Sequence, residues 1–104
     1  MNKEKLATLC SYGDYSNSNY GSHCMRVTLP ASRKNKHGIT IYFSYDTVVA
    51  FRGWVNNKRV LVVHKNDYSR TTGKHLNCID GGDKKGRVDD TTFEKLYRQA
   101  LKNA

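Results

Sequence analysis

The fold is decided by the stretch ITIYFSYDTVVAFRGWVNNKRVLVVHK, residues 39–65. Its first part, ITIYFSY, places apolar side chains at every second position, which is the pattern of a strand with one buried face. Asp46 and Thr47 then turn the chain, and two runs rich in Val, Phe and Leu follow. Between these runs Asn56 and Asn57 tolerate positive φ in a tight turn. The stretch therefore predicts three antiparallel strands joined by short connections.

One more strand is expected before this stretch. Residues 24–29, CMRVTL, alternate between apolar and other side chains with a period of two. The segment PASRKNKHG, residues 30–38, separates them from the next strand, and Pro30 and Gly38 punctuate its ends. It holds the densest positive charge of the chain, so we expect an exposed hairpin loop with a basic tip.

A helix is expected at the C-terminal end. Apolar residues recur at helical spacing from Phe93 to Leu101, and Thr91 with Glu94 matches a capping box. The pattern predicts a helix over about residues 92–102.

A second, short helix is expected before a polar, flexible connector, DKKGRVDD. Ser69, Thr71 or Thr72 could each cap it, and it would extend through Cys78. The pair Gly81-Gly82 would end it.

These elements predict an α+β fold: a four-stranded antiparallel meander with one face covered by the C-terminal helix and the short helix. The length of 104 residues is typical of one domain, so we expect a single small α+β domain over residues 1–104. The expected core consists of Val27, Leu29, Ile41, Phe43, Val49, Phe51, Leu61, Val63, Phe93, Leu96, Ala100 and Leu101.

Residues 11–22, SYGDYSNSNYGS, form a loop of Tyr, Ser, Asn and Gly with one Asp. Such a composition is often disordered, because it has no aliphatic side chains to bury. Its tyrosines could also pack across the sheet or stack directly on nucleobases. The sequence leaves these three interpretations open.

The charge of the chain favours acidic or phosphate-rich partners. Its 18 Lys and Arg against 9 Asp and Glu give a formal net charge of +9 and a pI near 9.6, which attract nucleic acid, a nucleoprotein or an acidic host protein. No run of apolar residues is long enough for a signal peptide or a membrane span. No membrane partner is therefore expected. The three cysteines cannot all pair within one chain, so we expect reduced thiols and a cytoplasmic location.

The polar stretch after the last strand, HKNDYSRTTGKHLNCID, residues 64–80, is the first candidate for a site. A helix that starts near Thr72 would offer backbone amides, a hydroxyl and a lysine to an anion, although the Walker spacing is absent. A merely well-capped helix is the structural alternative. The candidate anion or partner site consists of Tyr68, Thr72, Gly73, His75 and Asn77, and the candidate nucleic-acid-binding residues are Arg33, Lys34, Lys36, Lys65, Arg70 and Lys74.

Metal binding and catalysis are less favoured. His75 and Cys78 have an H-x-x-C spacing that His23-Cys24 could complete around zinc, but no C-x-x-C pair exists, so no metal and no cofactor are expected. No local signature selects a catalytic residue, and an enzyme is less expected than a binding protein. A metal-independent nuclease could still combine a base, an acid and cations; its candidate residues are His64, Lys65, Tyr68, Lys74 and His75. We instead expect His75 to be a structural residue that hydrogen-bonds the turn.

Three patches, which run from Tyr12 to His23, from Phe43 to Phe51 and from Asn66 to Asn77, resemble a family of small uncharacterised proteins of bacteriophages and other mobile elements. Tyr68 stands where such proteins carry Trp, and the basic loop and the C-terminal helix are additional. The resemblance implies a bacterial host and supplies no catalytic residues to carry over to this chain. It also suggests a role for His75 and Asn77 in a shared fold or site. It makes an inhibitor of host defence, such as an anti-CRISPR protein, a hypothesis. The alternative is a protein-directed inhibitor with no affinity for free nucleic acid.

Overall fold

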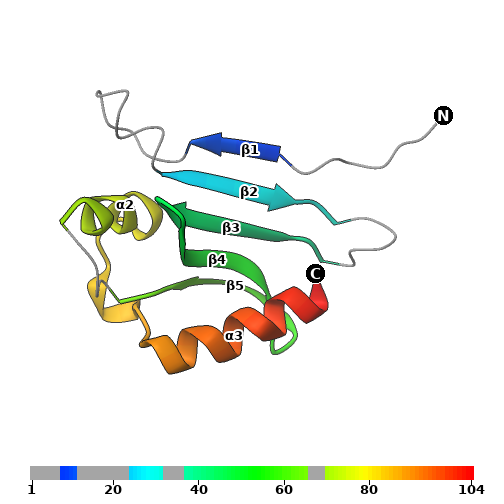
Figure 1. Cartoon of the computed structure of the whole chain (residues 1–104). Coiled ribbons are helices and arrows are strands. Elements are labelled where there is room, and N and C mark those ends of the chain that lie inside the picture. Colours follow the sequence, from blue (N-terminus) through cyan, green and yellow to red (C-terminus); the bar gives the residue numbers. More distant parts are fainter. Residues whose placement is uncertain (1–7, 12–23, 32–36, 66–69) are drawn as a thin grey trace.

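The computed structural model describes residues 8–11, 24–31, 37–65 and 70–104 (Figure 1). The Tyr-rich loop, except Ser11, and the charged centre of the loop at 30–38 lie outside these residues. The elements in chain order are β1 (Thr8–Ser11), β2 (Met25–Leu29), β3 (Ile39–Ser44), β4 (Thr47–Val55), β5 (Lys58–Val63), α2 (Arg70–Asp80), a 3-10 turn η1 (Lys84–Gly86) and α3 (Asp90–Asn103).

The strands form one antiparallel meander in the order β1-β2-β3-β4-β5. The α+β class and the antiparallel sheet with two helices are confirmed, and the described sheet has β1 as a fifth strand beside the four expected ones. Asn56 and Asn57 form the β4–β5 turn with φ values of 52° and 64°, as their tolerance of positive φ predicts. The preceding turn consists of Tyr45 and Asp46, because Thr47 already pairs with Ser44.

The two helices cover opposite faces of the sheet, which corrects the expectation that both pack on one face. Cross-strand partners share a face, so the pairs of Phe51 with Ile41 and Val62 place these three residues in the core against α3. The next row, centred on Ala50, packs on the other side with Leu76 of α2. The physical reason is visible in the run Val48–Phe51, where consecutive apolar side chains alternate to both faces and each face needs its own cover.

The core against α3 is built around Phe51, whose ring lies 5.5 Å from that of Phe93 and 5.4 Å from that of Tyr97, measured between centroids. Gly53 lets the helix approach closely, because a Cβ there would lie 3.0 Å from the Cβ of Ala100. The other expected core residues are buried or half-buried, but Leu101 is 42% exposed. Fully or almost fully buried residues outside the expected core list include Ile39, Val55 and Leu76.

Helix α3 begins earlier than the capping-box pattern predicts. Its N-cap is Asp89, whose carboxylate accepts a hydrogen bond of 2.8 Å from the backbone N–H of Thr92, so Thr91 lies inside the helix. This bond lowers the pKa of Asp89 below its ordinary value, since it favours the charged carboxylate. Helix α2 ends as expected, with Gly81 and Gly82 at positive φ.

The connector between the helices is ordered, contrary to the expectation of a flexible segment. Arg87 is 8% exposed and donates from Nε to Asp80 at 2.8 Å and from Nη2 to Asn77 at 2.9 Å. Val88 then forms a parallel bridge with His64. The connector is therefore attached to α2 through a buried guanidinium group and to the end of β5 through the backbone of Val88.

Candidate nucleic-acid interface

The structure separates the predicted cationic residues into two groups. Lys65 lies exposed just after β5, and Lys74 lies exposed on α2, whose first residue is Arg70. The loop at 30–38 joins β2 to the start of β3, whereas α2 contacts the end of β3 at Ser44. The predicted residues Arg33, Lys34 and Lys36 of that loop lie outside the described part of the chain, as does Tyr68.

The predicted anion site on α2 turns toward the protein interior. Thr72 and His75 are 4% and 0% exposed, and both contact the hydroxyl of Ser44, at 2.8 Å from Thr72 Oγ1 and 2.7 Å from His75 Nδ1. This geometry favours the structural interpretation of His75. Gly73 is half-buried, and Asn77 is exposed and accepts the bond from Arg87 described above.

His64, the other candidate base of a nuclease, is also buried, at 3% exposure. Its Nδ1 donates to the backbone oxygen of Lys65 at 2.6 Å, and its Nε2 lies 3.1 Å from Asp90 Oδ1. The imidazole thus joins the end of β5 to the first residue of α3. His64 and His75 contact different partners, and the described contacts do not bring them into one site.

A cationic surface occupies the half of the sheet that α2 leaves open. The register places the next rows of this face beside the row that packs under α2: Thr28, Thr40 and Arg52 in one row, and Trp54 with Arg59 in another. We call this surface the arginine face. Its six polar and aromatic residues are Thr28, Thr40, Arg52, Trp54, Arg59 and Arg26, of which Arg26 lies at the β2 end of the row of Tyr42 and Ala50. Leu61 shares the row of Arg52.

The side chains of the arginine face are accessible and carry one sign of charge. Arg52 and Arg59 are exposed, and the other four residues are half-buried. The hydroxyls of Thr28 and Thr40 lie 3.4 Å apart, which confirms that the two side chains share the face. The sequences of strands β2 to β5 contain no Asp or Glu. These strands therefore add no negative side chain to the face.

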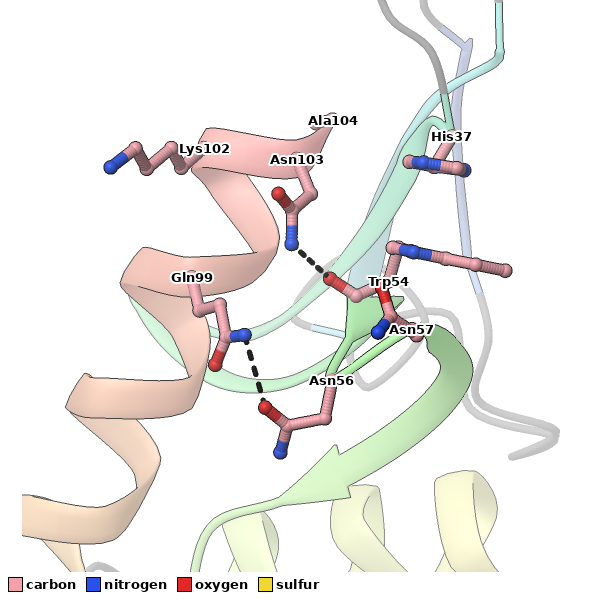
Figure 2. A pocket seen from close by; sticks show the side chains of 8 residues that line it. All are labelled: His37, Trp54, Asn56, Asn57, Gln99, Lys102, Asn103 and Ala104. Carbon is pink, nitrogen blue, oxygen red and sulfur yellow. Dashed lines mark hydrogen bonds between the residues drawn. The ribbon is translucent and has the colours of Figure 1, made fainter.

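An aromatic pair stands at the end of the arginine face. The rings of Trp54 and His37 stack with their centroids 4.2 Å apart and their planes within 3° of parallel (Figure 2). Arg59, the cross-strand partner of Trp54, donates from Nη2 to the backbone oxygen of His37 at 2.9 Å. The arginine thus holds the start of β3 beside the indole.

A pocket of about 550 Å³ adjoins this pair, where the β4–β5 turn meets the C-terminal end of α3 (Figure 2). Amide side chains fix its walls: Gln99 donates to Asn56 Oδ1 at 3.2 Å, and Asn103 donates to the backbone oxygen of Trp54 at 2.9 Å. The lining residues are His37, Trp54, Asn56, Asn57, Gln99, Lys102, Asn103 and Ala104.

The sequence analysis missed this surface, although a usable signal was present. A two-residue turn at Asn56-Asn57 dictates that Trp54 pairs with Arg59, and the period of two then adds Arg52 to the same face. The stack of His37 on the indole had no such signal, since it depends on how the loop at 30–38 returns.

Other site types find no support in the described residues. The described ranges contain no group of three or more His, Cys, Asp or Glu side chains placed to hold a metal ion. Cys24 is buried and Cys78 is exposed, and neither forms a disulfide bond. None of the helices in the described part of the chain is long and apolar enough to cross a bilayer.

The fold and this surface define an α+β protein whose antiparallel meander carries a helix on each face, with a cationic and aromatic half of one face that neither described helix covers. The chain belongs to a family of unknown function, DUF8033, whose model matches residues 14–95. The match includes every residue of the arginine face. It does not include Gln99, Lys102, Asn103 and Ala104, which line the pocket from the α3 side. Comparison with curated proteins and with solved structures finds no match.

Proposed function

We propose that this protein binds nucleic acid, free or within a nucleoprotein, through the arginine face and without catalysis. The observation that carries the proposal is the placement of three arginines and the single tryptophan on one sheet face, in strands that hold no carboxylate. The net charge of +9 adds a long-range attraction for phosphates.

The chemistry of the face suits a phosphate backbone. A guanidinium group binds phosphate oxygens through two parallel hydrogen bonds, and Thr hydroxyls can donate to the same oxygens. An exposed sheet with aromatic and cationic side chains is also a platform on which bases can stack. The antiparallel register spaces these groups along adjacent strands, so that one strand of nucleic acid can meet several of them.

The residues predicted from the sequence enter this proposal as contributors to the positive field. Arg33, Lys34 and Lys36 precede His37 in the chain, and Lys65, Arg70 and Lys74 belong to the opposite end of the sheet. The resemblance to phage proteins supports a setting in the cytoplasm of a bacterial host, where a basic binder could act as an inhibitor of host defence, for example on a guide RNA or target DNA.

The proposal is tested by fluorescence anisotropy with labelled oligonucleotides over a series of salt concentrations. We expect log affinity to fall linearly with log salt concentration, and Arg52→Glu to weaken binding at least tenfold and to reduce the slope by about 1. Lys95→Glu is the matched control, since it makes the same charge change at an exposed position on α3. This helix covers the sheet face opposite the arginine face. Affinity independent of salt, or equal losses in the two variants, would contradict the proposal.

A pull-down from bacterial lysate, with and without nuclease treatment, covers the protein-directed alternative. Binding through nucleic acid predicts that nuclease removes the captured material. A stoichiometric complex with one host protein that survives nuclease, combined with no affinity for free RNA or DNA, would replace the proposal with a protein-directed inhibitor.

A further inference from the structure

We propose that the pocket beside Trp54 and His37 receives an unpaired nucleobase, so that the protein prefers single-stranded nucleic acid to duplex. This inference rests on the proposed function and adds its substrate class. It starts from the geometry of the pocket rather than from the charge of the arginine face, because a duplex would satisfy the charge equally well.

The aromatic pair already shows what the indole accepts. The imidazole of His37 lies parallel to the indole of Trp54 at a stacking distance (Figure 2). Arg59 holds the backbone of His37 in place. A nucleobase is a flat heteroaromatic ring of the same kind and can join this stack. Such stacking tolerates any base but needs a free base face, which the interior of a duplex does not offer.

The amides of the pocket suit the polar edge of a base. The bonds from Gln99 to Asn56 and from Asn103 to the backbone of Trp54 hold two amides in fixed orientations. These bonds leave the amide nitrogen of Asn56 and the side-chain oxygen of Asn103 for other partners. Figure 2 shows these two atoms on opposite sides of the amide group, so each can contact a different polar group of a bound nucleotide.

Charge and size agree with a nucleotide of a strand. Lys102 lies on the α3 side of the pocket with its side chain extending outward from the helix, and His37 lies on the opposite side (Figure 2). Arg59 is bonded to the backbone of His37 and can hold a phosphate that flanks a base stacked on the pair. None of the eight described lining residues has an acidic side chain, and the volume falls in the range of ordinary ligand sites, about 300 to 1,000 Å³.

The sole tryptophan of the chain makes the test specific to this pocket. The full chain is titrated with a short single-stranded DNA, the RNA of the same sequence, the corresponding duplex and an abasic strand of equal length. We expect both single strands to quench the fluorescence of Trp54 and to bind at least tenfold more tightly than the duplex. The abasic strand keeps the phosphates, so we expect it to bind as weakly as the duplex and without quenching.

Variants separate stacking from charge. His37→Ala and Trp54→Ala should reduce the affinity for single strands about tenfold or more and leave that for duplex nearly unchanged, whereas Trp54→Phe keeps an aromatic ring and should retain most of the preference. Thermal melts identify any variant that fails to fold, and His37→Ala leaves the strands untouched. Arg52→Glu should weaken both forms alike.

The two proposals fail in different ways. Equal affinity for single strands and duplex, or an abasic strand that binds as tightly as the intact one, would overturn the inference and leave the proposed function standing. No binding of any oligonucleotide would overturn the proposed function itself, and the inference with it.

Discussion

Ser44 at the end of β3 and His75 in the middle of α2 are joined by a buried hydrogen bond of 2.7 Å between Oγ and Nδ1. The hydroxyl of Thr72 contacts the same Ser44 oxygen at 2.8 Å. Three polar side chains that are almost fully buried thus hydrogen-bond through the Ser44 hydroxyl where the helix meets the sheet. This relationship attaches α2 to its face of the sheet in addition to the apolar contacts of Leu76.

Loss of this cluster should destabilise the fold. Ser44→Ala leaves a buried imidazole nitrogen without its partner, so we expect the free energy of unfolding to fall by about 1 to 3 kcal/mol. His75→Ala also opens a cavity and should cost about 2 to 4 kcal/mol. Urea titrations measure both variants and the double variant, whose total cost should be less than the sum of the two single costs.

Cys78→Ala, at an exposed position of the same helix, is the control and should change stability by less than about 0.5 kcal/mol. A fully stable His75→Ala would show that the cluster does not attach the helix. Nucleic-acid binding through the arginine face should be the same in a folded Ser44→Ala variant as in the wild type.

Gly53 and Ala100 set the distance between the sheet and α3. A Cβ at Gly53 would lie 3.0 Å from the Cβ of Ala100 and 3.4 Å from Ile39 Cγ1, closer than side chains normally pack. Gly53→Ala should therefore destabilise the protein by about 1 to 3 kcal/mol through overpacking. The second substitution Ala100→Gly removes the opposing methyl group.

The pair of substitutions tests the contact directly. The double variant carries the helix cost of glycine, about 1 kcal/mol. Because it also relieves the overpacking at Gly53, it should be more stable than the sum of the two single effects predicts. Strict additivity in chemical denaturation would show that the two residues do not press on each other.

The sequence predicted those parts of the fold whose determinants are local. Asn56-Asn57 tolerates positive φ and Gly81-Gly82 ends a helix, and both features lie where the pattern placed them. Strand β1 was missed because TLCS is short and lacks a clear alternation. The cover on both faces was missed because both helices were expected on one face of the sheet, whereas the apolar run at 48–51 supplies side chains to both faces.

The site was harder to predict because it depends on contacts between distant segments. Arg87 looks like one more charge in a polar connector, yet its partners on α2 bury it. Trp54 lies in an apolar strand, where a core position is the ordinary expectation. Only the assembled sheet shows that it stands at the end of an open face, stacked on His37.

The start of α3 offers a direct comparison of the sequence pattern with the structure. Asp89 accepts the bond from the Thr92 N–H, and Thr91 is the second residue of the helix. Asp89→Ala should lower the melting temperature, because a backbone donor at the helix start loses its acceptor. Thr91→Ala should leave the melting temperature nearly unchanged or raise it slightly. A larger loss in Thr91→Ala than in Asp89→Ala would show that Thr91, as the capping-box pattern predicts, caps the helix.

Asp80 and Arg87 should make stability depend on pH in the acid range. Burial alone would raise the pKa of Asp80, but the hydrogen bonds from Arg87 and from the Gly82 N–H, together with the charge of Arg87, hold it below its ordinary value of 3.8. The folded state therefore binds its proton less readily than the unfolded chain does. The stabilisation by this carboxylate is complete above the ordinary pKa and is lost as the pH falls through the lower, folded value.

Two substitutions separate this carboxylate from the rest of the acid response. Arg87→Met leaves a largely buried carboxylate, 9% exposed, without its cation, and should cost about 3 kcal/mol at neutral pH. Asp80→Asn removes the titrating group, so its unfolding free energy should decline less than that of the wild type between pH 5 and strongly acidic pH. Denaturant titrations at a series of pH values measure both effects. If wild type and Asp80→Asn lose stability in parallel over that interval, the pair does not hold the carboxylate in its charged form.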